Sequence, residues 1–214
     1  MKLQLALDFA DRSEAIEIVQ KTSNFIDIIE VGTPLIFREG LGMVSEMKNA
    51  FPNKAVLADL KIMDAGEYET QLAIDSGADI VTVLGVAADL TIKKAVEAAQ
   101  SSGKEVMVDL IEVRDIKSRC VRLQELSVDI VCVHTAFDLQ ATKSISFKDL
   151  LCIKDVSHIK TAVAGGITPQ NIDLVLPLRP DIVVVGLGIT NAPNVRRAAR
   201  EIAEKLKSPR KGSK

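Results

Sequence analysis

The chain alternates eight times between short β-branched runs and stretches whose apolar residues recur every three or four positions. This alternation predicts eight strands, each followed by a helical segment. The expected strands cover residues 3–8, 26–31, 54–60, 79–84, 105–110, 129–134, 160–164 and 181–186. Eight such units favour an α/β fold of one domain, a closed parallel (β/α)8 barrel of the TIM type. An open doubly wound sheet is the alternative, but it usually contains fewer strands.

The barrel is expected to span residues 1–206, and the polar residues 207–214 are expected to form a disordered tail. A short phrase recurs at a period near 50 residues, as Asp79-Ile80-Val81, Asp129-Ile130-Val131 and Asp181-Ile182-Val183. This echo indicates repeated strand–helix units. Helix starts are predicted at polar residues that can cap a first turn: Asp11 or Ser13, Asp64, Asp89, and Thr168 with Pro169.

Composition excludes several classes of function. The formal net charge of −2 gives no general attraction to nucleic acid. No apolar run approaches the 18 residues typical of a membrane span, and the first residues lack the layout of a signal peptide. The three cysteines, Cys120, Cys132 and Cys152, have no Cys-x-x-Cys spacing, so reduced thiols are expected. A cytoplasmic protein with no nucleic-acid or membrane partner is therefore predicted.

Ionisable residues collect where the expected strands end. The first strand ends at Asp8 and the second at Glu30, and the third ends with Asp59 and Lys61. The fifth ends at Asp109 and the sixth at His134. In a parallel barrel these ends meet at one rim, where active sites lie. His158 precedes the seventh strand at the opposite end and is expected to be structural.

The residue types at this rim suit metal-assisted proton transfer. Glu30 and Asp59 are candidate ligands for Mg²⁺, which takes one or two protein carboxylates. An ion pair between Glu30 and Lys61 without a metal is the alternative. Lys61 offers a positive charge that could stabilise an enolate oxygen, or an amine that could form a Schiff base. His134 has the pKa range suited to moving a proton.

Two glycine-rich turns follow the last two strands. Gly165 and Gly166 follow the seventh strand, while Gly186, Leu187 and Gly188 follow the eighth. Loops at these places form the usual phosphate site of barrel enzymes, because glycine allows backbone N–H groups to approach an anion. Together the turns predict a phosphorylated substrate.

The pattern Asp59-x-Lys61-x-x-Asp64 resembles that of the orotidine-phosphate decarboxylase superfamily. Further segments are similar to its 3-hexulose-6-phosphate synthase branch, over essentially residues 1–206. These are Leu5-Ala6-Leu7-Asp8, Ile29-Glu30-Val31-Gly32-Thr33-Pro34, Leu57 to Gly66, Val81-Thr82-Val83-Leu84-Gly85, Val133-His134-Thr135 and Ala164-Gly165-Gly166-Ile167.

The resemblance implies a magnesium-dependent aldol reaction that joins D-ribulose 5-phosphate and formaldehyde into D-arabino-hex-3-ulose 6-phosphate through a cis-enediolate. It also implies a homodimer with shared active sites. By this resemblance, Glu30 and Asp59 would bind Mg²⁺, while Lys61 and Asp8 would contact the substrate and the enediolate. His134 would transfer the C1 proton, and Asp109 would contact substrate hydroxyls or the water shell of the metal. Asp64 would enter the neighbouring subunit's site, and the phosphate would be bound by Gly165, Gly166, Gly186 and Leu187.

Two alternatives remain at this point. The first is 3-keto-L-gulonate-6-phosphate decarboxylase, which shares the scaffold and the enediolate. The typical pattern of that branch has arginines after the sixth-strand histidine and in the eighth-strand turn. At these places this chain has Thr135-Ala136-Phe137 and Leu187 instead. The second is a noncatalytic barrel that binds sugar phosphates. Orotidine-phosphate decarboxylase itself is disfavoured, because Leu57 stands where its first lysine would be.

Overall fold

The computed structural model describes residues 1–8, 11–140 and 147–207, and within them eight parallel strands close into one barrel in chain order. All eight predicted strands are confirmed, with bounds shifted by one or two residues. They are β1 Lys2–Leu7, β2 Ile28–Val31, β3 Ala55–Ile62, β4 Ile80–Leu84, β5 Glu105–Asp109, β6 Ile130–His134, β7 Lys160–Ala164 and β8 Ile182–Val185. Because β8 pairs with β1, the barrel has no open edge and the doubly wound alternative is wrong.

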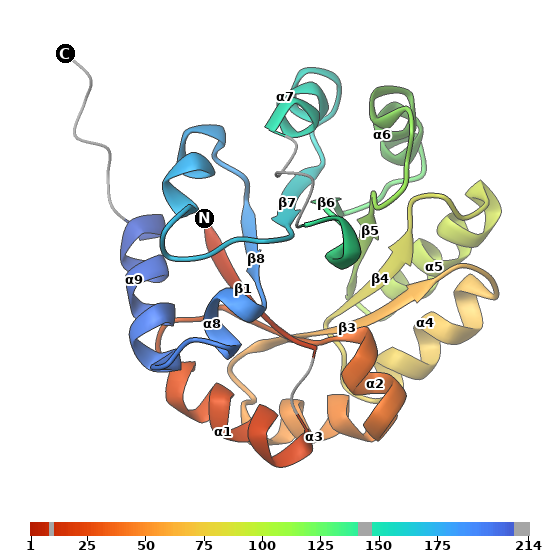
Figure 1. Cartoon of the computed structure of the whole chain (residues 1–214). Coiled ribbons are helices and arrows are strands. Elements are labelled where there is room, and N and C mark those ends of the chain that lie inside the picture. The colour runs from red at the N-terminus through yellow and green to blue at the C-terminus, as the bar shows by residue number, and fades with distance from the viewer. Residues whose placement is uncertain (9–10, 141–146, 208–214) are drawn as a thin grey trace.

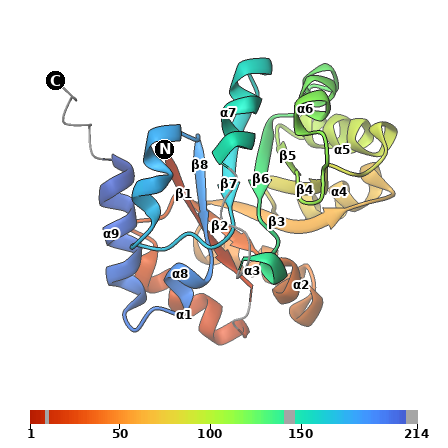
Figure 2. The same ribbon diagram turned by 45° about the horizontal axis from the view of Figure 1, so that its top comes forward.

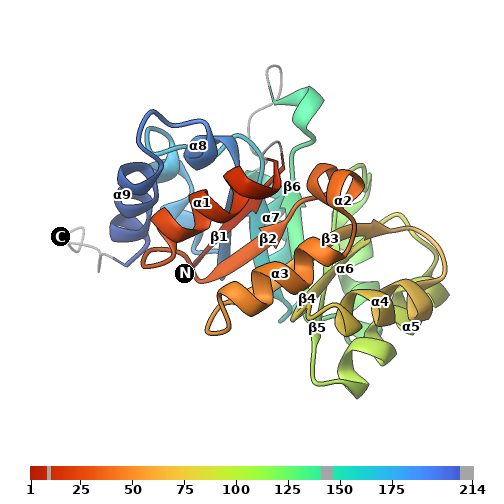
Figure 3. The ribbon, with the colours of Figure 1, turned by 90° about the horizontal axis from the view of Figure 1, so that it is seen from below.

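Helices surround the barrel in chain order (Figure 1). They are α1 Arg12–Thr22, α2 Thr33–Glu39, α3 Gly42–Ala50, α4 Gly66–Asp75, α5 Asp89–Ser101, α6 Ile116–Glu125, α7 Phe147–Val156, α8 Leu187–Thr190 and α9 Val195–Lys207, with a 3-10 turn η1 at Phe137–Leu139. Figure 2 shows the strands inside this ring, and Figure 3 shows α1 and α3 across the outer face of the first strands. Helix α9 packs against α1, which closes the outer layer as β8 closes the inner one.

The predicted helix at Thr168 and Pro169 is wrong. After β7 the chain forms two 3-10 turns, η2 Ile172–Leu174 and η3 Leu176–Leu178. Pro177 lies inside this segment, and it cannot donate the backbone hydrogen bond that an α-helix requires. Thr168 instead donates its backbone N–H to Asn171 Oδ1, which closes a tight turn.

The other predicted helix starts divide into one confirmed cap and two corrections. Asp11 is the N-cap of α1 and accepts the N–H of Glu14. Helix α4 begins at Gly66 after a left-handed Ala65, so Asp64 is not its cap. Asp89 is the first residue of α5, and its carboxylate binds Arg119 and Arg122 of α6. The tail prediction for 207–214 is modified at its start, because Lys207 ends α9, while residues 208–214 lie outside the described residues.

The buried apolar residues form two layers. One lies between strands and helices, and the other fills the barrel interior. The lower part of the interior, at the end where the strands begin, contains one isoleucine from every second strand: Ile28, Ile80, Ile130 and Ile182. Inward side chains from alternate strands form such layers of four in (β/α)8 barrels. The interior is therefore a packed core and not a channel.

An aspartate directly precedes each of these isoleucines and binds the neighbouring strand. Each carboxylate accepts a backbone N–H near the start of the preceding strand, at 2.7–2.9 Å. The pairs are Asp27 with Leu3, Asp79 with Val56, Asp129 with Val106 and Asp181 with Thr161. The Asp-Ile echo in the sequence thus has a physical cause: one residue joins paired strands at the lower rim, and the next fills the core.

No helix within the described residues is long and apolar enough to cross a membrane. The three cysteines are free thiols, as predicted. Cys120 and Cys132 are buried, and Cys152 is half-buried. Burial raises the pKa of the Cys120 thiol to about 12, so this thiol is protonated at neutral pH and unreactive.

We predict that Asp79→Ala lowers the free energy of unfolding by about 1–3 kcal/mol, because the buried N–H of Val56 loses its acceptor. Asp79 also binds Lys48 at 2.6 Å and Lys104 at 2.8 Å, so the same change releases two cations. Urea unfolding measures the loss. The control is Asp75→Ala, which removes an exposed carboxylate bound to Gln71 and should cost less than about 0.5 kcal/mol. Equal stability of the two variants would refute the structural role of Asp79.

Candidate active site

The structure brings five of the predicted strand-end residues into one cluster at the upper rim, the end of the barrel where the strands finish. Asp8 lies beside them. Glu30, Asp59 and Asp109 are buried, with 8%, 4% and 4% of their surface exposed. Lys61 and His134 are half-buried. Buried carboxylates are unfavourable unless cations or hydrogen bonds compensate them. Three buried carboxylates beside Lys61 and His134 therefore mark this rim as the candidate active site.

Asp59 is the most fully bonded member of the cluster. Its Oδ1 accepts the hydroxyl of Thr82 at 2.7 Å, and its Oδ2 accepts the hydroxyl of Thr33 at 2.9 Å and pairs with the ammonium group of Lys61. Thr82 also accepts the backbone N–H of Lys61 at 2.9 Å. The β2, β3 and β4 strand ends therefore fix Asp59 and Lys61 as one unit.

A bulge in β3 aims Lys61 at this unit. The pairing of β3 with β4 shifts between Ala58 and Ile62, and Lys61 has a φ of 48°. A non-glycine residue in this left-handed region costs about 1–3 kcal/mol. Such bulges re-aim side chains beside active sites. The strained backbone of Lys61 therefore serves to place its side-chain amine beside Asp59.

Lys61 is a fixed positive charge. Burial alone would lower the pKa of its amine, but the negative charges of Asp59 and Asp109 outweigh burial and raise this pKa above its usual range. Lys61 Nζ lies 3.7 Å from Asp109 Oδ2 as well as beside Asp59. A Schiff base requires a neutral amine, so this environment disfavours that alternative.

Glu30 has a different partner from the one considered in the ion-pair alternative. Among the described residues its carboxylate accepts a hydrogen bond from Gln4 Nε2 at 2.6 Å, while Lys61 forms its ion pairs with Asp59 and Asp109. Burial, followed by the charges of Asp59 and Asp8, raises the pKa of Glu30 well above its usual range. The ionised form of Glu30 thus has no ion pair within the described chain, and the charge of Lys61 offsets only part of the cost of its burial.

The cluster fits a hard divalent cation. Burial and the charge of Asp59 also raise the pKa of Asp8, so the negative charges of the cluster exceed what Lys61 neutralises. No set of three or more His, Cys, Asp or Glu side chains in the described residues could hold a metal ion. Two carboxylates from adjacent strands, completed by water or substrate oxygens, match the way Mg²⁺ binds. Glu30 and Asp59 are therefore suited to hold it.

Asp109 and His134 form a pair that the sequence did not reveal. His134 Nδ1 lies 2.8 Å from Asp109 Oδ2, and Asp109 Oδ1 accepts the N–H of Ile111 at 2.9 Å. Burial opposes ionisation of Asp109, but the hydrogen bond and charge of His134, with the charge of Lys61, hold its pKa below the usual range. Asp109 therefore orients the imidazole and leaves Nε2 for proton transfer.

The glycine-rich turns meet beside Asp8. A cavity of about 280 Å³ is bounded by Asp8, Phe137, Gln140, Gly165, Gly166, Gly186, Leu187, Gly188 and neighbouring residues. Gly165 has a φ of 104°, and a Cβ there would lie 2.6 Å from the carbonyl oxygen of Thr135. The first-turn N–H groups of Leu187 and Gly188 donate no backbone hydrogen bond among those of the described loops. This arrangement can bind an anion such as phosphate.

A close approach between strands fixes Asp8. A Cβ on Gly32 would lie 2.2 Å from Asp8 Oδ1, and one on Gly186 would lie 3.3 Å from Asp8 Oδ2. The Asp8 carboxylate therefore lies between the end of β2 and the end of β8, with glycine required at Gly32. This position joins the charged cluster to the anion cavity.

Asp64 does not join the cluster of its own chain. Its side chain is exposed, and its Oδ1 accepts the N–H of the adjacent Ala65 at 2.7 Å. Sequence reasoning also missed Gln4, Thr33 and Thr82. Gln4 carries a usable signal, because a polar residue inside the run Leu3 to Leu7 shares the inward face with Ala6. The two threonines carry none, since threonine is ordinary in strands and helix starts.

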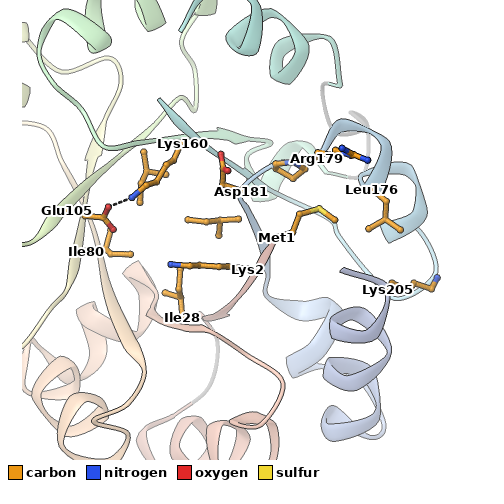
Figure 4. A pocket seen from close by; sticks show the side chains of 13 residues that line it. Met1, Lys2, Ile28, Ile80, Glu105, Lys160, Leu176, Arg179, Asp181 and Lys205 are labelled. Carbon is orange, nitrogen blue, oxygen red and sulfur yellow. Dashed lines mark hydrogen bonds and ion pairs between the residues drawn. The ribbon is translucent and has the colours of Figure 1, made fainter. Parts of the chain in front are cut away.

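A larger cavity lies at the opposite end of the barrel (Figure 4). It measures about 950 Å³ and is lined by residues at the starts of strands, among them Lys2, Ile28, Glu105 and Lys160. Lys160 is paired with Glu105 there. None of the clustered strand-end residues lines it. Size alone therefore does not identify the candidate active site, which lies at the other rim.

Comparison with known proteins shows the family of the chain. The model of the orotidine 5'-phosphate decarboxylase / HUMPS family matches residues 1–202. The chain belongs to this family. It is 50% identical over 205 residues to 3-hexulose-6-phosphate synthase of Bacillus subtilis, which covers 95% of this chain and 98% of that protein.

Two solved structures extend the comparison. That of 3-hexulose-6-phosphate synthase from Salmonella typhimurium is 45% identical, with a TM-score of 0.94 over 96% of this chain and 98% of the other. That of 3-keto-L-gulonate-6-phosphate decarboxylase from Vibrio cholerae O1 is 25% identical, with a TM-score of 0.84 over 96% of each chain. The fold is common to both, while sequence similarity is much higher to the synthase.

We predict that Glu30→Gln stabilises the cation-free protein at neutral pH. The raised pKa of Glu30 means that the folded state keeps its proton to higher pH than the unfolded chain, so wild-type stability falls as pH rises from the ordinary glutamate range through this raised pKa. Glutamine bears no charge at any pH. The stability gained by the variant over the wild type is therefore greatest above the raised pKa of Glu30 and vanishes below the ordinary pKa range of glutamate. We expect the substitution to raise the free energy of unfolding by about 1–3 kcal/mol, because it removes the unfavourable burial of a charge. Each kcal/mol should raise Tm by roughly 2–4 °C.

Thermal unfolding in EDTA across pH 4–8 measures this effect. Glu17→Gln is the matched control, because Glu17 is exposed on α1 and pairs only with Lys21 among the described residues. Its Tm should follow that of the wild type at every pH. A Glu30→Gln protein that is no more stable than the wild type at neutral pH would show that burial of Glu30 carries no cost.

Proposed function

We propose that this protein is a magnesium-dependent 3-hexulose-6-phosphate synthase, a carbon–carbon lyase. It would condense D-ribulose 5-phosphate with formaldehyde to D-arabino-hex-3-ulose 6-phosphate through a cis-enediolate, and catalyse the reverse. The observation that carries the proposal is the joint presence of two chemical units at one rim: Glu30, Asp59 and Lys61, and the Asp109–His134 pair. The 50% identity to the Bacillus subtilis synthase supports the same reaction.

Glu30 and Asp59 would hold Mg²⁺ at the centre of the site. Bound there, the cation would stabilise negative charge on the two adjacent oxygens of the ketose during enolisation. Thr33 and Thr82 orient the Asp59 carboxylate, and its Oδ1, which accepts one hydrogen bond, has a lone pair left for a ligand. Lys61 lies beside Asp59 and adds a second positive charge toward the enediolate.

His134 would move the C1 proton. Its Nδ1 is held by Asp109, so Nε2 is the nitrogen that can accept a proton from carbon. The ionised Asp109 also favours the imidazolium that forms after this transfer. Removal of the proton gives the enediolate, whose carbon would attack formaldehyde, and the alkoxide formed from formaldehyde would take the proton back from the imidazolium of His134. Asp8, held between Gly32 and Gly186, would contact a substrate hydroxyl.

The cavity at Gly165, Gly166, Gly186 and Leu187 would bind the phosphate of the sugar. Glycine at residues 165, 166 and 186 lets the backbone N–H groups of these turns approach an anion without obstruction by a Cβ. Anchoring the phosphate at the β7 and β8 ends would place the ketose carbons over the cluster. Binding energy remote from the reacting carbon would in this way position it.

The two alternatives fit the site less well. The decarboxylase branch is expected to use arginines to protonate its intermediate, whereas the described cavity beside Asp8 has Phe137 and Leu187 among its lining residues and no arginine. A noncatalytic sugar-phosphate barrel would need the anion cavity but neither the strained Lys61 nor the Asp109–His134 pair.

We also propose a homodimer with shared active sites. Large apolar side chains are exposed around α4 and α5, including Met63 at 52%, Tyr68 at 67% and Leu90 at 67%. Tyr68 and Leu90 line one groove together with Asp64. Exposed apolar patches of this kind mark interfaces. A partner seated here would cover the patch and receive Asp64, which its own chain leaves exposed.

We predict that Lys61→Ala and Asp59→Ala reduce turnover by at least about 100- to 1000-fold while the barrel stays folded, because each removes charge that would stabilise the enediolate. The assay follows magnesium-dependent loss of formaldehyde with ribulose 5-phosphate, and EDTA should abolish it. Lys93→Ala, on the exposed face of α5, is the control and should be fully active. Normal rates in both site variants, or rapid release of carbon dioxide from 3-keto-L-gulonate 6-phosphate, would defeat the assignment.

We predict that the protein is dimeric by light scattering and that Leu90→Glu shifts it toward monomer. Leu174→Glu is a matched control, since Leu174 is 61% exposed on η2, away from α4 and α5. Mixing Lys61→Ala with Asp64→Ala tests site sharing. Half of randomly paired dimers are mixed and each contains one intact site, so about a quarter of wild-type activity should return. A monomeric wild type, or no recovery on mixing, would overturn shared sites.

A further inference from the structure

Gln4 is a buried polar residue below the proposed cation site. It lies on β1 with 1% of its surface exposed, and it pairs in register with Ile28, two residues before Glu30 on β2. Its Nε2 donates to Glu30 Oε2 at 2.6 Å, and both groups are buried. When Glu30 is ionised, as a ligand of a cation is, its carboxylate only accepts hydrogen bonds, so the amide then keeps its nitrogen toward Glu30.

The other end of this amide is unsatisfied. Gln4 Oε1 is buried and has no hydrogen-bond partner among the described residues. The surrounding interior is apolar, with Ala6, Ile28 and Val184 in the same part of the core. A side chain selected for stability at this position would be leucine or methionine, because an unpaired buried carbonyl is unfavourable. The amide is therefore explained by its one contact, with Glu30.

A neutral donor has a specific effect on Glu30. Lys61 pairs with Asp59 and compensates part of its charge, whereas Gln4 orients Glu30 and leaves its charge in place. An arginine or lysine at residue 4 would neutralise the carboxylate, and an acid would repel it. The amide holds one oxygen of Glu30 and leaves the second available to a ligand.

We propose that Gln4 is a positioning residue for the cation site: it fixes the Glu30 carboxylate so that its free oxygen and Asp59 bind one divalent cation. This inference rests on the proposed function, in which Glu30 and Asp59 hold Mg²⁺. Partners that orient metal-binding carboxylates typically change metal affinity or activity 10- to 100-fold when they are removed. Gln4 touches neither the cation nor the substrate and acts through Glu30 alone.

Gln4→Met tests the proposal, because methionine has a similar length and lacks the donor. Free Mn²⁺, a hard cation for oxygen ligands, is measured by electron paramagnetic resonance during titration of the cation-free protein without substrate. The variant should bind Mn²⁺ about 10- to 100-fold more weakly than the wild type. Thermal unfolding in EDTA should give a Tm close to that of the wild type, because removal of the unpaired carbonyl offsets the loss of the hydrogen bond to Glu30.

Thr70→Val is the matched control. Thr70 is fully buried on α4 and its hydroxyl is the other buried side-chain atom without a partner in the described chain. This change should alter stability without altering Mn²⁺ affinity. If Gln4→Met does not fold, Gln4→Asn decides, because it keeps the amide one methylene short of Glu30 and should weaken binding in the same direction.

The outcomes separate the two proposals. A wild type that binds no Mn²⁺ refutes the metal-dependent function and with it the role of Gln4. A wild type that binds Mn²⁺ with a folded variant of equal affinity refutes the role of Gln4 alone. A variant with weaker binding and a strongly lowered Tm also overturns the inference, since Gln4 would then be needed for the fold.

Discussion

Closure of the barrel is the constraint on which the rest of this structure depends. Pairing β8 with β1 removes every sheet edge and forces alternate side chains inward from all strands. At the lower end the inward positions hold isoleucines, and the aspartates before them bind the neighbouring strands. At the upper end the same geometry leaves charged side chains facing one another. A stable lower rim and a reactive upper rim are thus two ends of one hydrogen-bonded cylinder.

The upper rim is electrostatically unfavourable as the chain alone builds it. Glu30 and Asp8 have raised pKa values because burial and like charges oppose their ionisation, and Lys61 is already engaged with Asp59 and Asp109. The left-handed backbone of Lys61 and the unpaired carbonyl of Gln4 add further cost. These unfavourable features lie together at the upper rim, whereas the four aspartates of the lower rim each bind a backbone N–H of a neighbouring strand. Such a distribution is what a site prepared for a cation and an anionic substrate requires.

The sequence predicted the barrel well because strand and helix periods are local properties. It also placed Asp8, Glu30, Asp59, Asp109 and His134 at one rim, since strand ends follow from strand positions. It did not predict contacts that depend on register and rotamer. The Asp109–His134 pair, the Gln4–Glu30 bond and the binding of Val56 by Asp79 join residues more than 20 positions apart. The helix expected after β7 failed because Pro177 outweighed a plausible start at Thr168. The place of Asp64 in a partner's site remains a prediction.

The same scaffold can carry an aldol reaction or a decarboxylation because both pass through an enediolate, so the difference must lie in what reaches that intermediate. A decarboxylase must deliver a proton to the enediolate carbon, and cationic side chains near the sixth and eighth strands would serve this step. Here Phe137 and Leu187 line the cavity beside Asp8 at those places. Apolar groups supply no proton and limit water, which leaves the carbon free to attack an aldehyde instead. Proton transfer would then be confined to His134, which Asp109 holds and which lies on β6, the strand next to β7 and its part of the anion cavity. Selectivity between the two reactions would therefore be set less by the charges of the cluster than by the apolar side chains of Phe137 and Leu187 beside Asp8.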